Sequence, residues 1–337
     1  MKLTRIFVPL VASMVLYSCA SNNLSYESKA FKNAYASIKT EELKKNLSVI
    51  ASDEMQGRDT GSEGQKKAGK YMIDFYKNIG VSYPKALGSY YQTVPKEALK
   101  SRGKELPESE NILAFIEGTE KPNEIIVVSA HYDHVGTKDG VVYNGADDDG
   151  SGTVAVMEIA EAFQQAKKAG KGPKRSILFL HVTGEEHGLL GSKYYADHPV
   201  YDMKNTVVDL NIDMIGRSDK ENEGKNYVYV IGSEMLSSEL KVINEAANKI
   251  THNLELNYKY DDPKDPMRLY YRSDHYNFAK SGVPVAFYFD GIHADYHQPT
   301  DDVDKIDFPL LQKRAQLVFA TAWELANRKD RIVVDKK

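Results

Sequence analysis

The sequence predicts an α/β fold, a three-layer sandwich whose largely parallel mixed central sheet carries helices on both faces. Near-continuous apolar runs, typical of buried strands, alternate with amphipathic segments at helical spacing. With 42% hydrophobic and 27% charged residues over 337 positions, the chain can bury a substantial core. Because no repeat or linker follows Thr40, we expect a single domain at residues 40–330 and a C-terminal tail at 331–337.

The first residues have the pattern of a targeting signal. Lys2 and Arg5 precede an apolar stretch, Ile6 to Leu16, which is too short to span a bilayer as a mature helix but suits a signal peptide. The stretch ends in "LYSC", and Cys19 is the only cysteine, which excludes a disulfide framework. This pattern resembles the bacterial lipoprotein signal.

That resemblance implies removal of residues 1–18 and lipidation of Cys19, which would hold the protein on a membrane of the bacterial cell envelope. The following "ASNNL" lacks an acidic cluster, so the periplasmic side is favoured over the cell surface. Residues 19–39 are small and polar and are expected to form a tether.

Two amphipathic helices are predicted ahead of the sheet. In "TEELKKNLSVIAS", Thr40 is a possible N-cap and Leu43, Leu47 and Ile50 share one face. The second helix carries apolar residues at helical spacing from Ala68 onward and is expected to stop at Gly80.

Six strand-like runs then follow. They lie at residues 111–118, 124–136, 175–186, 207–217, 226–232 and 283–291. A helix with an apolar face is predicted between the second and third runs, in "GTVAVMEIAEAFQQAKKAG".

The charge balance argues against a polyanionic partner. The formal net charge is -4, so no overall basic field exists to bind nucleic acid.

Histidines and carboxylates stand where several strands run out, and the carboxyl ends of parallel strands meet in one crevice. These residues are His131, Asp133, His134, Asp147, Asp148, Asp149, Glu185, Glu186 and Asp213, with His297 near the end of the chain. Imidazole and carboxylate donors without a thiolate favour Zn²⁺ over Mn²⁺ or Co²⁺. Two histidines and three carboxylates exceed the needs of one open tetrahedral ion and suit two ions that share a carboxylate.

The order of the motifs "HYD", "DDDGSG", "EE", "IDM" and "YH" resembles the co-catalytic zinc aminopeptidases, metallopeptidase family twenty-eight, over roughly residues 43–327. The resemblance implies a peptidase domain that holds two Zn²⁺ ions, acts on peptide substrates and has a cis peptide between Asp148 and Asp149. It further implies one zinc on His131 and Asp213, the other on Glu186 and His297, a bridging Asp148, and Glu185 as the general base.

Supporting roles are expected for three more residues. Asp133 lies two positions beyond His131, on the same side of an extended strand, and could accept a hydrogen bond from its second ring nitrogen. Asp301 is expected to do the same near His297. The resemblance implies that Tyr296 donates a hydrogen bond to the tetrahedral oxyanion.

Other polar residues match no ligand position. His134, His187, His275 and His293 are expected at the rim or in the core. The segment Arg272 to His275 lies where related enzymes build substrate pockets.

Several activities fit this pattern. A carboxypeptidase or dipeptidase and a glutaminyl cyclase-like enzyme are alternatives, whereas the intact ligand set argues against a non-catalytic binding lipoprotein. An aminopeptidase is favoured because a carboxylate-rich site suits a cationic N-terminus. A pocket arginine could reverse that preference in favour of a substrate C-terminal carboxylate, and the candidates are Arg217, Arg268 and Arg272. The sequence names neither the preferred N-terminal residue nor the oligomeric state.

Overall fold

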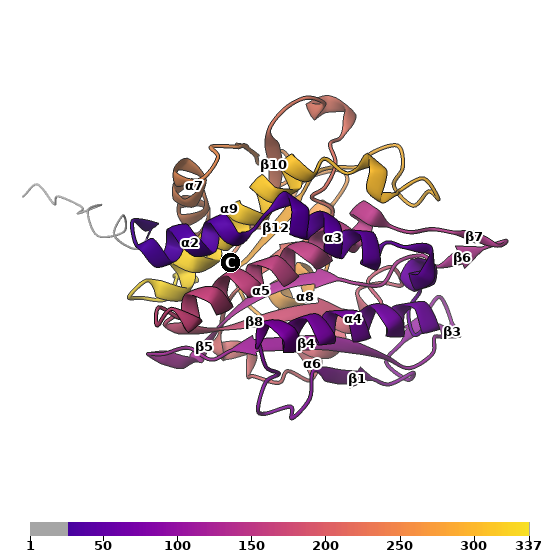
Figure 1. Ribbon diagram of the computed structural model, residues 1–337, viewed down its shortest axis with the longest axis horizontal. Helices are drawn as coiled ribbons and strands as arrows, with labels where there is room; N and C mark the ends of the chain where they lie inside the picture. Colours follow the sequence, from indigo (N-terminus) through magenta and orange to yellow (C-terminus); the bar gives the residue numbers. More distant parts are fainter. Residues whose placement is uncertain (1–25, 337) are drawn as a thin grey trace, which may run out of the picture.

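A central sheet of eight strands organises the computed structural model, which describes residues 26–336 (Figure 1). The strand order is β1-β4-β8-β5-β9-β12-β10-β11. The inner strands β8, β5, β9 and β12 run parallel to one another, and β4 and β10 are antiparallel to their inner neighbours. The predicted mixed, largely parallel sheet is confirmed.

All six predicted strands form, as β4, β5, β8, β9, β10 and β12. The strands of the sheet are β1 (Tyr91–Val94), β4 (Ser109–Ile116), β5 (Lys121–His131), β8 (Arg175–Val182), β9 (Thr206–Ile212), β10 (Tyr227–Ile231), β11 (Glu255–Asn257) and β12 (Val285–Phe289). Two small hairpins stand apart from it: β2 (Lys100–Ser101) with β3 (Lys104–Glu105), and β6 (Thr137–Lys138) with β7 (Val141–Val142).

Helices cover both faces of the sheet. The helices are α2 (Lys29–Ser37), α3 (Thr40–Ile50), α4 (Glu63–Ile79), α5 (Gly152–Lys168), α6 (Leu190–Asp197), α7 (Leu240–Ile250), α8 (His275–Lys280) and α9 (Phe308–Asn327). One apolar core joins α2, α3, α4, α5, α7 and α9 to one face, and a second joins α6 and α8 to the other. The architecture is therefore the predicted three-layer sandwich.

The inner strands are buried on both faces, which explains their near-continuous apolar sequence. Every residue of β8 and of β9 is buried. Along β5, Val128 packs in the first core and its neighbour Val127 in the second. The sheet thus forms a rigid base whose carboxyl edge carries the polar residues.

Helix ends follow the local sequence. The Ser62 side chain caps α4 by accepting a hydrogen bond from the Gln65 amide (3.1 Å), and Gly80 ends the helix at φ 80° as expected. At α3 the prediction differs by one residue, because Lys39 is the N-cap. Thr40 is the first helical residue, and its hydroxyl bonds the Gln312 side chain.

Folded structure begins before the predicted boundary at Thr40. Helix α2 lies inside the range expected as a tether, and Phe31 is buried against Phe319 and Trp323 of α9, with ring centroids 5.8 and 5.6 Å apart. The segment is polar overall but presents one apolar stripe to the core. The expected signal peptide and Cys19 lie outside the described residues, and no helix within residues 26–336 is long and apolar enough to cross a bilayer.

Candidate metal centre

Parallel pairing brings the predicted ligand residues to one edge of the sheet. Strand β5 ends at His131 and pairs with β8 on one side and β9 on the other. Glu185 and Glu186 follow β8, and Asp213 follows β9 directly. Because all three strands run the same way, their carboxyl ends meet.

One group of donors surrounds His131. Its Nε2 lies 3.2 Å from Asp148 Oδ1 and 3.6 Å from Asp213 Oδ1. All three residues are buried, and their ligand atoms lie within 4.8 Å of one another. This is the group predicted for the first metal.

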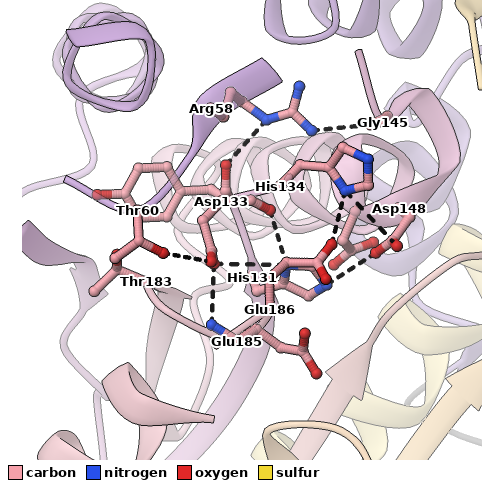
Figure 2. Close-up of polar contacts among 12 residues, drawn as sticks. Arg58, Thr60, His131, Asp133, His134, Gly145, Asp148, Thr183, Glu185 and Glu186 are labelled. Atoms are coloured by element: carbon pink, nitrogen blue, oxygen red, sulfur yellow. Dashed lines mark hydrogen bonds and ion pairs between the residues drawn. The ribbon is translucent and has the colours of Figure 1, made fainter. Parts of the chain in front are cut away.

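A second group surrounds Glu186. His297 Nε2 lies 3.0 Å from Asp148 Oδ2 and 3.0 Å from Glu186 Oε2. His134 Nδ1 lies 2.8 Å from Glu186 Oε1 (Figure 2). His134 is buried, within the rim-or-core placement expected of it, and it lies beside this second candidate position.

The donors fit two zinc ions that share Asp148. Its two carboxylate oxygens face different groups, with Oδ1 toward His131 and Oδ2 toward His297. His131 Nε2 and Asp148 Oδ2 are buried without a hydrogen-bond partner among the described residues, which is costly unless a cation pairs with them. Imidazole nitrogens and carboxylate oxygens are ordinary zinc donors.

Asp133 acts differently from the prediction. The ring nitrogen Nδ1 of His131 lies 3.0 Å from the backbone oxygen of Asp133, whereas the Asp133 carboxylate is 3.7 Å away. That carboxylate instead accepts hydrogen bonds from the Glu185 amide (3.2 Å) and from the Thr60 hydroxyl (2.8 Å) (Figure 2). Asp133 therefore ties the end of β5 to the loop that carries the expected general base.

Only the middle residue of the acidic triplet faces the metal positions. Asp147 Oδ1 accepts from the Gly216 amide (2.6 Å), and Asp149 Oδ1 accepts from the Gly152 and Met214 amides (2.9 and 3.1 Å). These bonds fasten the turn before α5 to the loop after β9. The Asp148–Asp149 peptide bond is cis, as predicted.

Asp301 also departs from its expected role. Its carboxylate accepts hydrogen bonds from the backbone amides of Asp147 and Asp148, at 3.0 and 3.1 Å from Oδ2. Asp301 thus holds the backbone of Asp148, the candidate shared ligand, instead of orienting the His297 ring.

Arg58 is a structural residue that the sequence analysis did not identify. Its fully buried guanidinium donates to the carbonyls of Tyr132 (3.0 Å), Asn144 (2.6 Å), Gly145 (2.9 Å) and Ile50 (2.8 Å). Figure 2 shows the bond to Gly145. Tyr132 follows His131, and Asn144 and Gly145 precede the acidic triplet. One side chain therefore joins two ligand-bearing loops to the end of α3.

Serine and histidine side chains complete the surroundings. The Ser273 hydroxyl donates to Asp213 Oδ2 (2.6 Å), so the segment Arg272 to His275 supports a ligand carboxylate. His293 Nε2 lies 3.1 Å from Asp147 Oδ2, and His187 Nε2 lies 3.0 Å from Asp59 Oδ1. His275 is buried and stacks on Phe287 at 4.7 Å, as expected of a core histidine.

Electrostatics at the site favour bound cations. Burial raises the pKa of Glu185 well above its usual range, and the carboxylates of Asp213 and Glu186 raise it further, although His131 opposes them. Burial lowers the pKa of His297, but the nearby carboxylates of Asp148 and Glu186, each 3.0 Å from Nε2, outweigh it and raise the pKa to about 10. The cluster therefore attracts positive charge.

A small pocket with a mixed polar and apolar lining opens beside the two groups. Glu185, Asp148 and Asp213 line one side of it, and the other lining residues are Met214, Leu269, Arg272, Phe287, Phe289, Ile292 and Tyr296. Tyr296 is half-buried and its ring stacks on His297 at 3.9 Å. Of the three arginines named above, only Arg272 lines the pocket, because Arg217 pairs with Asp295 (2.9 Å) and Arg268 lies over the Tyr271 ring.

Fold and site together define an α/β protein with two candidate metal positions on a shared aspartate. A model of peptidase family M28 matches residues 111–322, so the chain belongs to that family.

Individual relatives agree with this assignment. The chain is similar to a probable leucine aminopeptidase of Arthroderma otae, with 30% identity over 222 residues that cover 64% of this chain and 57% of the relative. Aminopeptidase YwaD of Bacillus subtilis is 29% identical over 261 residues, 73% of this chain and 51% of its own. The chain thus spans about half the length of the curated relatives it matches. The crystal structure of Legionella pneumophila LapA aminopeptidase shares the fold, with a TM-score of 0.71, 19% identity, and coverage of 98% of this chain and 81% of that one.

Proposed function

We propose that this protein is a dinuclear zinc aminopeptidase, which removes N-terminal residues from peptides. The observation that carries the proposal is the position of Asp148, whose two oxygens face separate histidine and carboxylate groups while Glu185 lines the adjoining pocket. The aminopeptidases among its relatives support the same reading. One zinc would be held by His131 and Asp213, the other by Glu186 and His297, and Asp148 would bridge them.

Zinc ions held there would supply Lewis acidity toward water and toward the scissile carbonyl. Glu185 would take the proton of the attacking water and pass it to the leaving amine. Burial raises the pKa of Glu185 above its usual range, which makes its carboxylate a stronger proton acceptor. Asp133 fixes the loop of this base through the Glu185 amide.

The same pocket suits a substrate with a free amino group. Glu185 and Asp213 lie at the pocket that would take the first residue, so a substrate ammonium can approach carboxylates there. The remaining wall is largely apolar and would receive an apolar first side chain, such as leucine or phenylalanine. The Tyr296 hydroxyl would donate to the oxyanion that forms at the scissile carbonyl.

A carboxypeptidase reading is disfavoured by the arginines. Arg217 and Arg268 are engaged elsewhere, and Arg272 lines the pocket together with Asp148, Glu185 and Asp213, whose carboxylates oppose a substrate carboxylate. A glutaminyl cyclase-like reading is disfavoured because both donor groups are complete.

The test compares leucyl peptides with a free and with an acetylated N-terminus, after chelation and after reloading with Zn²⁺. We expect hydrolysis of the free peptides alone, and only in the zinc-loaded protein. Equal hydrolysis of both forms would refute the amine requirement, and full activity after complete metal removal would refute the zinc mechanism.

We further propose that Cys19 anchors the protein by lipidation to an envelope membrane, facing the periplasm. The support is the "LYSC" pattern after a short apolar stretch. We expect Cys19→Ala to release the protein from the membrane fraction. Unchanged membrane retention of that variant would contradict the anchor.

A further inference from the structure

A second cleft adjoins the first pocket at the metal centre, and the two share Glu185, Arg272 and Tyr296 among their lining residues. It has a volume of about 680 Å³, within the range of small-ligand sites. Glu185, Glu186 and His297 line its base, together with Gly188, Leu189 and Leu190. Since Glu185 lines both spaces, the cleft is placed to receive the leaving part of a peptide whose first residue occupies the first pocket.

The hairpin β2–β3 forms the outer wall of this cleft. Lys100, Ser101 and Arg102 line it, and Tyr271 and Arg272 are among its other lining residues. The hairpin base is fixed next to the expected general base, since Leu99 is fully buried and its Cδ2 would lie 3.4 Å from a Cβ added at Gly184. A hydrogen bond from the Leu106 amide to the Leu99 carbonyl (2.8 Å) closes the hairpin.

The cationic side chains that line the cleft include Lys100 and Arg102 of the hairpin and Arg272. Glu185 and Glu186 are the only carboxylates among its described lining residues, and both lie at the metal centre. Lys100 is paired with Glu105 of the same hairpin (3.0 Å). Arg102 is exposed at the turn, and within residues 26–336 no carboxylate lies within ion-pair distance of its guanidinium.

We propose that Arg102 binds the C-terminal carboxylate of short peptides and so gives this enzyme a preference for dipeptides and tripeptides. A zwitterionic peptide matches the cleft, because its ammonium would lie toward Glu185 and Asp213 and its carboxylate toward the hairpin. A guanidinium is suited to a carboxylate because it can donate two parallel hydrogen bonds. This inference rests on the aminopeptidase activity proposed above and adds its substrate class.

The experiment uses the full-length zinc-loaded protein and measures kcat/KM for leucylglycine, leucylglycylglycine and their C-terminal amides. Leucinamide serves as a reference that cannot reach the hairpin. We expect the free acids to be preferred over the amides by about three- to tenfold at low ionic strength. The preference should shrink at 1 M salt, because the guanidinium is exposed to solvent.

Replacement of Arg102 should remove that preference selectively. We expect Arg102→Gln to lower kcat/KM for the free acids to the level of the amides, without changing the rate for leucinamide. Arg102→Lys should keep part of the preference. Lys104→Gln is the matched control, because Lys104 lies on the same hairpin but not among the residues lining the cleft.

The outcomes separate the two proposals. An unchanged ratio of free acid to amide in Arg102→Gln overturns the role of Arg102, as does an equal loss on acids and amides. If the unmodified protein hydrolyses no leucinamide and no peptide, the aminopeptidase proposal itself fails.

Discussion

The backbone amide of Glu185 donates a hydrogen bond to the carboxylate of Asp133, with 3.2 Å between nitrogen and Oδ1. The other carboxylate oxygen accepts a bond from the Thr60 hydroxyl, so both oxygens of this fully buried group are used. The ring nitrogen Nδ1 of His131 contacts the backbone oxygen of Asp133 and not its carboxylate. The principal structural role of this carboxylate is therefore to place the loop of the expected base.

The first prediction separates hydrogen bonding from charge at position 133. Asparagine can still accept from the Glu185 amide and donate to the Thr60 hydroxyl, whereas alanine leaves both groups unpaired. We expect Asp133→Asn to keep most of kcat and Asp133→Ala to lose about 10- to 100-fold. Steady-state kinetics with metal analysis measure both. An equally large loss in the two variants would show that the charge opposite His131 matters more.

The second prediction concerns the adjacent glutamates. Glu186 Oε2 contacts His297, whereas Glu185 lines the substrate pocket and is absent from both candidate metal groups. We expect Glu185→Gln to keep two zinc ions and lose most of kcat, and Glu186→Gln to lose zinc. Metal content per chain, measured alongside activity, decides the assignment, and the reverse pattern would exchange the two roles.

The sequence could predict that His131, Glu186 and Asp213 lie near one another, because each stands at or shortly after the end of a strand that the hydrophobic pattern reveals. Their roles as metal ligands, like those of Asp148 and His297, follow from the resemblance and stay predictions. His131, Glu186 and Asp213 stand at the ends of three adjacent parallel strands, so element order alone brings them together. Arg58 could not be found this way. Its partners are backbone carbonyl oxygens, which every residue carries, so the sequence does not indicate which residues they belong to. The same applies to Asp301, which binds backbone amides.

Helix α2 was missed for a different reason. Its composition is polar, and what holds it is the packing of Tyr26 and Phe31 against α9, nearly three hundred residues further along the chain. Long-range packing of this kind is not visible in local periodicity. The approach of His134 to Glu186 was not predicted, because it depends on how two loops meet.

The third prediction tests Arg58 as the residue that joins the ligand loops. Lysine cannot reach all four carbonyls, and each buried acceptor left unpaired costs about 1–3 kcal/mol. We expect Arg58→Lys to lower the free energy of unfolding by about 3 kcal/mol and to weaken zinc binding. Urea unfolding and zinc titration with a competing chelator measure the two effects.

A matched control variant separates an effect on zinc binding that is specific to Arg58 from a general loss of protein stability. Arg175 is also fully buried, and it donates to Glu124 and to the carbonyls of Leu325 and Arg328 at the opposite end of β8. Arg175→Lys should destabilise the protein comparably and leave zinc affinity unchanged. If both variants weakened zinc binding equally, Arg58 would have no special role at the site.

The fourth prediction concerns Glu158, a buried carboxyl on α5 that accepts a hydrogen bond from Asn46 (2.8 Å). Burial, reinforced by Glu161 and Glu42, raises its pKa to about 8. Below about pH 4.5 the group is protonated in folded and unfolded chains alike, and its contribution to stability is complete. Between about pH 4.5 and 8 only the unfolded chain ionises, so that contribution is lost as the pH rises.

Glutamine at position 158 keeps the hydrogen bond from Asn46 and cannot ionise. We therefore expect Glu158→Gln to gain stability over the native chain between pH 5 and pH 9, by on the order of 3 kcal/mol in the free energy of unfolding. Urea unfolding at pH 5, 7 and 9 measures this, with the exposed Glu63→Gln on α4 as control. Parallel pH profiles for the native chain and Glu158→Gln would show that Glu158 is already ionised in the folded protein at neutral pH.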